Sequence, residues 1–399
     1  MRKIIITGLL KTITPLHITA PSDMRFDPQT GKVRTGTNKD GSVPCTCVQT
    51  MGIPYMGTET DEETGVEKTY RSVAKVPAIS GNNLNGHIRR HVANVFLEAL
   101  ADKGDQVNIT TYSAIKCGAA TGSPDGAPVS YEDFKKAEQH PFLGIMGGGP
   151  RLVGRKAKVW NATSICRETR ALHQRNRIPY FEIYEADWDT KLTDNGAEYT
   201  AKSQKGVWGY RRNDDLKTLA DISSAEGNIS DFAKAFEERQ TKIMDDFKND
   251  KEDGNTKTGL DTYQGLEFVI PGTAFPFVAI MENPTDAQAG LWFRGFERFC
   301  REDALGGWSR NGFGEFLFEE GMITVIEDDE IVSSQPYNPN RLQGVEDGTF
   351  HKEAVLAWAE ASRHVTGEEI NKLLKLGETK KEKAEKKKAK EAAAEQTEA

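Results

Sequence analysis

The stretch Leu305-Gly-Gly-Trp-Ser-Arg-Asn-Gly-Phe-Gly-Glu-Phe-Leu-Phe318 joins four glycines, an arginine and an asparagine to an alternating aromatic strand. Glycine tolerates positive φ angles and lets another backbone come close. Successive side chains of a strand point to opposite faces, so Phe316 and Phe318 share one face and Leu317 takes the other. The stretch therefore predicts a loop that wraps around a second backbone, and a strand whose phenylalanines pack in the core. A plain glycine-rich hairpin turn is the alternative interpretation.

The segments before this stretch predict the first strands and a helix. An apolar run over residues 3–19, broken at Pro15, predicts the first strand, and residues 70–79 predict another. Ser80 and Asn82 are the expected caps of the helix that follows. The helix is predicted because apolar residues recur on one stripe, namely Leu84, Ile88, Val92, Val95 and Phe96.

The remaining elements repeat that order. Residues 141–161 predict a glycine loop that leads into a basic strand, and residues 264–281 predict one or two core strands. Residues 287–300 predict a second packed helix, directly before the glycine-rich stretch. Strand, helix, strand, twice over, is the ferredoxin-like pattern, an α+β fold whose open sheet face is a common platform for single-stranded RNA.

Charge is distributed unevenly along the 399 residues. The net charge is −8, but residues 1–180 hold 24 Lys and Arg against 16 Asp and Glu, a difference of +8 that leaves −16 for the remainder. Residues 151–177 hold eight basic residues and one acid. A local basic stripe is what phosphate binding requires, whatever the overall charge.

Other features limit the classes of protein. We find no run of about 18 apolar residues and no signal peptide, so we expect a cytoplasmic protein without a membrane contact. Five cysteines argue against a disulfide framework. Cys45 and Cys47 are close together, but the sequence has no second Cys or His pair at zinc spacing, so we expect no metal and no cofactor.

The segment Ser80-Gly-Asn-Asn-Leu-Asn-Gly-His-Ile-Arg-Arg90 is the clearest candidate for phosphate binding. The start of a helix offers unpaired amides and the positive end of the helix dipole, and Asn82 and Asn83 can donate from their side chains. Arg89 and Arg90 follow, and only one of them can share the asparagine-rich face. Ordinary capping with solvated arginines is the alternative interpretation.

Histidines raise the possibility of a nuclease, because a positioned His with a Lys or Tyr can cleave RNA without metal. His17, His87 and His173 are the candidates, and nothing in the sequence shows that two of them converge. A structural, hydrogen-bonded role for each is the alternative. The carboxylates lie mainly in the polar insertions and form no metal-binding motif.

Four motifs occur together in the order found in the RAMP superfamily. They are Thr14-Pro-Leu-His-Ile18, the segment from Val76 to Arg90, Phe142-Leu-Gly144 with Gly154-Arg-Lys-Ala-Lys-Val159, and the segment from Leu305 to Gly314. Over residues 3–326 the chain resembles the repeated backbone subunit of a class 1 CRISPR effector complex, most closely the type IV version. Such subunits have an RRM-like palm that grips the guide RNA backbone and an inserted hairpin thumb that kinks the guide.

The resemblance implies a division of the chain and a set of RNA-binding residues. Residues 1–20, 70–185 and 263–326 would form the palm with its thumb; 21–69 would be a polar, partly mobile insertion; 186–262 a helical insertion; 327–377 an extension with a surface helix; and 378–399 a low-complexity tail. The motifs and the resemblance together indicate the RNA-binding residues Ser80, Asn82, Asn83, Asn85, Arg89, Arg90, Arg151, Arg155, Lys156, Lys158, Arg167, Arg170, His173, Arg175, Arg177, Arg310 and Asn311.

One departure from the family concerns catalysis. Relatives that cut target RNA carry an aspartate before the strand that leads to the helix motif, and Arg71 stands at that position here. The resemblance therefore implies a subunit with no catalytic residue, although Asp23 and Asp27 lie nearby. Its expected partners are the guide RNA, a DNA or RNA target, other effector subunits, and further copies of itself arranged head to tail.

Two other functions remain open. A RAMP-type endoribonuclease would process the repeat RNA with a histidine such as His17 and a lysine, as a monomer or dimer. A ferredoxin-like metabolic protein would use the glycine loop to bind phosphate.

Overall fold

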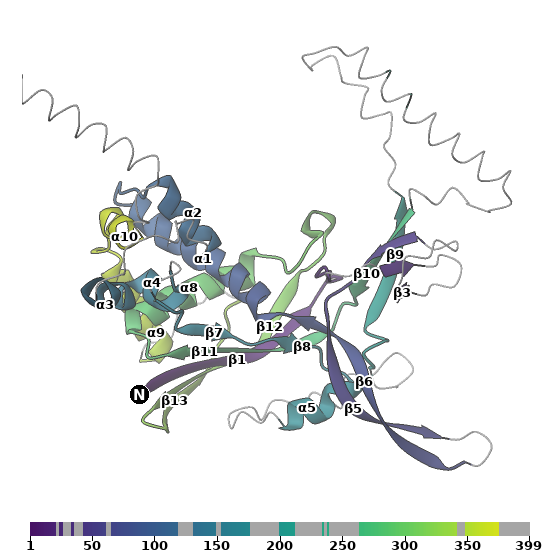
Figure 1. The fold of residues 1–399 in the computed structure, drawn as a ribbon. Coiled ribbons are helices and arrows are strands. Elements are labelled where there is room, and N and C mark those ends of the chain that lie inside the picture. The colour runs from purple at the N-terminus through teal and green to yellow at the C-terminus, as the bar shows by residue number, and fades with distance from the viewer. Residues whose placement is uncertain are drawn as a thin grey trace, which may run out of the picture.

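A five-stranded antiparallel sheet lies at the centre of the molecule (Figure 1). The computed structural model describes residues 1–20, 24–26, 33–35, 43–60, 65–118, 131–148, 153–175, 199–211, 263–340 and 348–374, together with positions 234 and 238. The strands follow the order β13-β12-β1-β11-β7. They span Arg2–Thr12 (β1), Ala157–Val159 (β7), Ala274–Glu282 (β11), Phe316–Glu327 (β12) and Glu330–Pro336 (β13).

Two helices pack on one face of this sheet. Helix α1 (Gly81–Ala101) precedes β7, and helix α8 (Asp286–Glu302) connects β11 to β12. The elements β1, α1, β7, β11, α8 and β12 thus follow the strand–helix–strand order that the sequence predicts twice. The α+β class is confirmed. Phe316 and Phe318 are buried beneath α8 while Leu317 is exposed, as the alternating pattern predicts.

Glycines let α8 approach its neighbours closely. A Cβ atom added to Gly295 would lie 2.2 Å from a side-chain carbon of Val92 in α1. A Cβ atom added to Gly290 would lie 1.9 Å from the carbonyl oxygen of Ala354. Both distances are below any van der Waals contact, so the backbones are held at separations that only glycine allows.

The opposite face of the sheet is aliphatic and buried. One cluster there consists of Ile5, Leu9, Ile165, Ala274, Val278 and Ile326, each at most 7% exposed. Base stacking on a sheet needs exposed aromatic rings. The expectation of an open sheet face that serves as an RNA platform is therefore wrong for these positions.

A second five-stranded sheet contains segments that the sequence analysis placed in insertions. Its order is β3-β2-β4-β10-β9, with β4 and β10 parallel. The strands span Met24–Phe26 (β2), Val33–Thr35 (β3), Val43–Thr46 (β4), Lys205–Arg211 (β9) and Tyr263–Val269 (β10). The two insertions thus contribute strands to an ordered sheet, and the assignment of 186–262 as helical is wrong at β9. Most of the predicted helical insertion, 186–262, lies outside the described residues.

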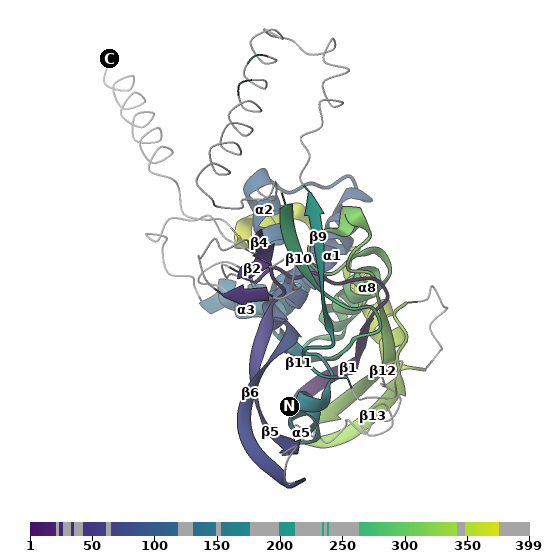
Figure 2. The same cartoon turned by 90° about the vertical axis from the view of Figure 1, so that its right-hand side faces the viewer.

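A long hairpin protrudes from the body (Figures 1 and 2). It is formed by β5 (Thr50–Thr60) and β6 (Glu67–Ile79), with the two-residue strand β8 (Ala162–Thr163) paired to the base of β6. One side of the hairpin packs against the turn η1 (Arg167–Thr169) and helix α5 (Arg170–Arg175). Ile53, Val76, Cys166 and Ala201 form the buried cluster at this contact.

The remaining helices flank α1 and α8. They are α2 (Ile109–Cys117), α3 (Tyr131–Gln139), α4 (Pro141–Met146), α9 (Phe350–Ala361) and α10 (Gly367–Leu373). The sequence analysis predicted an extension with one surface helix over 327–377, and the prediction of a single surface helix is wrong. Two helices form there, and Ala354, Trp358 and Ile370 belong to the main hydrophobic core.

Candidate nucleic-acid interface

The first turn of α1 is largely capped by the protein itself. The Ser80 hydroxyl accepts a hydrogen bond from the Asn83 amide at 3.2 Å, and the Asn161 side-chain oxygen accepts one from the Gly81 amide at 2.8 Å. Of the backbone amides of Gly81, Asn82 and Asn83, the Asn82 amide alone has no acceptor among the described residues. The start of α1 therefore offers a phosphate fewer backbone donors than the sequence implies, because one free amide is left.

Asn82, Gly86 and Arg90 lie on one side of α1, because they are four residues apart. Asn82 and Arg90 are exposed, and no atom lies within 4 Å of the position that a Cβ atom on Gly86 would take. A glycine inside a helix destabilises it by about 1 kcal/mol relative to alanine. No contact among the described residues requires that glycine, and it leaves an open strip between two polar side chains.

The basic strand brings Arg155 to this strip. Its guanidinium donates to the Asn82 side-chain oxygen at 3.5 Å, and the side chain is exposed. Lys158 is exposed but paired with Glu282 at 2.6 Å. Lys156 is half-buried and donates to the Gln288 side chain at 3.1 Å and to the Glu138 carbonyl at 3.4 Å, and burial lowers its pKa. Of the three predicted cations, Arg155 is the one that joins the start of α1.

Trp160 and Asn161, which the sequence analysis missed, complete this end of the interface. Trp160 is 44% exposed, and its backbone lies about 3.0 Å from where a Cβ atom on Gly81 would sit. Exposed aromatic rings and basic side chains are the groups that bind single-stranded nucleic acid. Both residues directly follow the predicted basic strand, but the sequence does not show that the chain turns there towards α1.

Arg89 and Asn85, both predicted RNA ligands, are buried, and this corrects the prediction. The Arg89 guanidinium donates to the carbonyl oxygens of Ala114, Ile115, Met146 and Gly147, at 2.8 to 3.4 Å. Burial lowers its pKa to about 10, so it remains charged at neutral pH. Arg89 therefore joins α2 and α4 to α1. Arg90 remains on the surface, in agreement with the expectation that only one of the two arginines shares the asparagine-rich face. Asn83 is half-buried, and its backbone amide donates a hydrogen bond to the Ser80 hydroxyl.

A carboxylate links α1 to the segment before the glycine loop. Asp303 accepts from His87 at 2.7 Å and from His91 at 3.1 Å, and Arg90 lies 4.0 Å away. Burial opposes the charge on Asp303, but the two histidines outweigh it and hold its pKa below the usual range. His87 therefore has a structural partner, and the sequence analysis missed His91 and Asp303 because they meet only after folding.

The glycine loop packs against the protein's own backbone. A Cβ atom on Gly306 would lie 2.2 Å from the His17 carbonyl oxygen, and the Gly307 amide donates to that oxygen at 2.8 Å. Phe313 is buried against Trp208 of β9. Arg310 and Asn311, in the short turn η4 (Ser309–Asn311), are exposed. The loop does wrap around a second backbone, and that backbone belongs to the same chain.

His17 does not reach the surface. It is completely buried, its ring nitrogens lie 2.6 Å from the Glu267 carbonyl and 3.1 Å from the Thr19 hydroxyl, and burial lowers its pKa. The endoribonuclease alternative that used His17 therefore has no accessible histidine at this position. A catalytic group must touch the proton that it transfers.

The basic segment around α5 is only partly described. Arg167 and Arg170 are exposed, and Arg167 lies 3.5 Å from Glu168. His173 is half-buried, and burial lowers its pKa to about 4, so it is neutral at pH 7 and adds no positive charge there. Arg175 lies at the end of α5, but its side chain is outside the described part, as are Arg151 and Arg177. The described contacts connect none of these residues to the start of α1.

Metal ligation was tested on the described residues. Within the ranges given above, no group of three or more His, Cys, Asp or Glu side chains is placed to hold a metal ion. The sulfur atoms of Cys45 and Cys47 are 3.8 Å apart. Arg71 is exposed on β6, opposite Met56, while Asp23 and Asp27 lie outside the described residues. No described helix is both long and apolar enough to cross a membrane.

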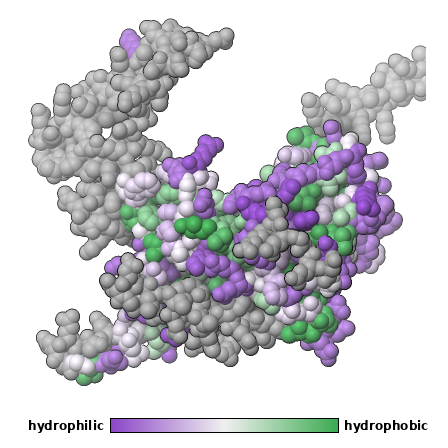
Figure 3. Space-filling view, turned by 180° about the vertical axis from the view of Figure 1, so that it is seen from behind, coloured by the Kyte–Doolittle hydropathy of each residue, from purple (hydrophilic) through white to green (hydrophobic). Residues whose placement is uncertain are grey.

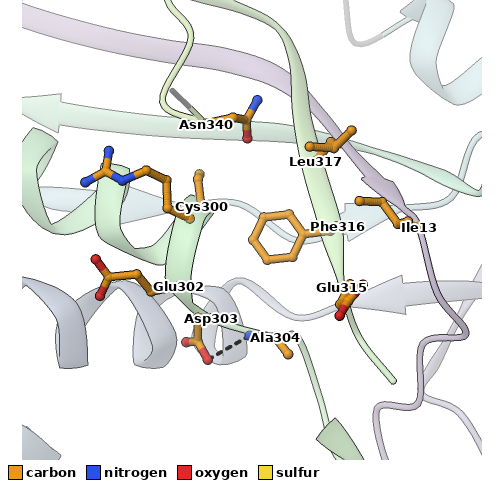
Figure 4. Close-up of a pocket in the computed structure, with 10 residues that line it drawn as sticks. Ile13, Cys300, Glu302, Asp303, Ala304, Glu315, Phe316, Leu317 and Asn340 are labelled. Carbon is orange, nitrogen blue, oxygen red and sulfur yellow. Dashed lines mark hydrogen bonds between the residues drawn. The ribbon is translucent and has the colours of Figure 1, made fainter. Parts of the chain in front are cut away.

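A pocket of about 630 Å³ opens where α8 ends and β12 begins (Figure 4). Its lining includes Phe316, Cys300 and the positively charged Arg301. Carboxylates lie on both sides of Phe316, Glu302 and Asp303 on one side and Glu315 on the other (Figure 4). Ile13 and Leu317, which are 48% and 41% exposed, form part of the rim.

Comparisons with known proteins were made for the whole chain. No protein-family model and no curated protein matches it. A solved structure titled "Type IV-B CRISPR Complex" contains a chain that is similar over 88% of this chain and 96% of its own, with 12% sequence identity and a TM-score of 0.35. At that TM-score the function has to be inferred from the residues of this chain.

Proposed function

We propose that this chain is an RNA-binding backbone subunit of a CRISPR effector complex, most like the type IV version, and that it does not cut nucleic acid. Several copies would bind head to tail along one guide RNA in the company of other effector subunits. Base pairing would then read the DNA or RNA target, while the protein reads the guide's backbone. The four motifs that occur in RAMP order support this proposal.

The observation that carries the proposal is the exposed strip at the start of α1. The Asn82 amide, the Arg155 guanidinium and the Arg90 side chain supply donors and charge along it, and Gly86 leaves room between them. Trp160 adds an exposed ring at the same end. Phosphate donors beside a stacking surface suit a single strand whose backbone is held.

Two features support a role without catalysis. His17 is buried and hydrogen-bonded, so it cannot reach a substrate. Arg71 places a positive charge where a cleaving relative would have a carboxylate, and a cation repels a divalent metal ion while it attracts phosphate. A guide-loaded complex should therefore leave end-labelled complementary RNA intact in the presence of Mg²⁺.

Gly86→Ala provides the sharpest test. The added methyl group has no neighbour within 4 Å in the described part of the chain, so the variant should fold and be more stable by about 0.4–1 kcal/mol. If an RNA backbone lies on the strip, the same methyl group should weaken RNA binding at least about tenfold, because a close contact is lost. Gly154→Ala is the matched control, since that glycine also has open space around it.

The protein should first be expressed alone and purified. We expect RNA to co-purify with an oligomer of the unmodified chain, and less RNA with Gly86→Ala than with Gly154→Ala. A nucleic-acid-free monomer, or equal RNA content in the two variants, would contradict the proposal. Specific cutting of labelled repeat RNA by a monomer or dimer would instead favour the endoribonuclease.

A further inference from the structure

The outward face of the β5–β6 hairpin alternates apolar and basic residues. Three cross-strand pairs lie on it: Gly52 opposite Lys75, Pro54 opposite Val73, and Met56 opposite Arg71. All six residues are exposed, with Met56 at 61% and Val73 at 64%. The other face carries Ile53 and Ala74, which pack against the η1 region. Hydrophobic and hydrophilic residues lie next to each other on the outer hairpin in Figure 3, at lower left.

The pocket at the end of α8 has complementary properties. Ile13 and Leu317 expose apolar surface at its rim, and Glu302 and Glu315 are exposed carboxylates. Within the described part of the chain, neither glutamate forms an ion pair. The Asp303 carboxylate already accepts hydrogen bonds from two histidines, and Arg301, which also lines the pocket, lies 4.0 Å from Glu297. Two cations and two apolar side chains on the hairpin thus match two carboxylates and two apolar side chains at the pocket.

The hairpin cannot fill the pocket of its own chain. Its base is fixed by the pairing of β6 with β8 and by the start of α1, which follows directly. Figures 1 and 2 both show the outer hairpin pointing away from α8 and the start of β12. The two surfaces can meet only if they belong to different molecules.

We infer that the outward face of the hairpin, centred on Met56, Arg71 and Val73, docks into the acidic, apolar-rimmed pocket of a second copy of this chain. The contact joins two different surfaces, so it repeats head to tail and leaves an open chain of copies. The inference deepens the proposed function and rests on its head-to-tail arrangement. It identifies the surfaces that meet, and it can be tested without RNA.

Disulfide trapping tests the contact at equilibrium. One protein carries Val73→Cys and the other Leu317→Cys, and both carry Cys117→Ser, because Cys117 is the exposed native cysteine of the five. On mild oxidation we expect the mixed dimer to form at least about tenfold faster than with Tyr70→Cys in place of Val73→Cys. Tyr70 is exposed too, but it lies on the opposite face of the hairpin.

Charge reversal provides the second part of the test. Arg71→Glu with Lys75→Glu should slow trapping about tenfold, because like charges then face each other. Glu302→Lys with Glu315→Lys in the partner should restore the rate. Trapping no faster than the Tyr70→Cys control, or unaffected by charge, would overturn the inference. If the charge-reversed hairpin is trapped at an unchanged rate but no longer binds RNA, the hairpin face binds RNA instead. If the protein without charge reversal is trapped as expected but never binds RNA, only the proposed function is refuted.

Discussion

Replacement of Arg89 by alanine should unfold the protein at a markedly lower temperature, although the residue looks like an RNA ligand in the sequence. Its two shortest hydrogen bonds, to Met146 at 2.8 Å and to Ile115 at 3.0 Å, are charge-assisted. Such bonds stabilise by about 1.5–3 kcal/mol each, and the other three are long. The Phe142 ring, 5.3 Å from the guanidinium, also loses its partner. We therefore expect a loss of about 3 kcal/mol.

For a chain of 399 residues, with an unfolding entropy of about 2.1 cal/mol/K per residue, about 3 kcal/mol corresponds to a decrease of about 4 °C in Tm. Differential scanning calorimetry of Arg89→Ala and of its neighbour Arg90→Ala measures this decrease directly. Arg90 is exposed, so its replacement should change the free energy of unfolding by about 0.5 kcal/mol at most. Equal Tm values for the two variants would refute the structural role of Arg89. Weaker RNA binding by an Arg89→Ala variant of unchanged stability would show that Arg89 binds RNA.

Three further predictions follow from the structure. His140 is buried with its pKa lowered to about 4, so the unfolded chain binds a proton below pH 6.5 that the folded chain does not bind. This histidine alone should lower stability by about 2 kcal/mol between pH 7 and 5, in addition to a similar contribution from His173. His140→Asn, which keeps a cap acceptor on α4, should remove the His140 contribution from a pH series of denaturant titrations. Arg155→Ala should reduce the slope of log affinity for single-stranded RNA against log salt by about 0.7, while Arg363→Ala, an exposed arginine on the far helices, leaves it unchanged. A thiol reagent should modify Cys117 rapidly in the folded protein and the four buried cysteines only after denaturation; rapid modification of a second thiol would contradict the fold.

Local periodicity was enough to predict the elements whose residues pack within one segment. Helix α1 and helix α8 have apolar residues at helical spacing, and the Phe316 and Phe318 alternation marks a half-buried strand. The orientation of these elements towards others was not predictable in the same way. Arg89 and Arg90 are adjacent, and only the position of α2 and α4 decides which of them is buried.

Elements that depend on distant partners were missed for the same reason. Strands β2, β3 and β4 have three or four residues each in polar sequence, and they are strands because they pair with one another and with β10. Trp160 was predicted neither as core nor as interface, because a single tryptophan after a short strand has no period. The Asp303 contact with His87 likewise joins residues 216 positions apart.

The two glycines of α8 limit how this protein can vary over evolution. A residue larger than glycine at Gly290 or Gly295 meets a backbone atom, and backbone cannot move aside as the end of a side chain can. Mutational scanning should therefore find these two positions intolerant even of alanine, whereas Gly86 and Gly154 have open surroundings and should accept it wherever RNA binding is not selected. Homologues that retain the glycine pair would keep the same three-helix layer of α1, α8 and α9, however far the rest of their sequences diverge.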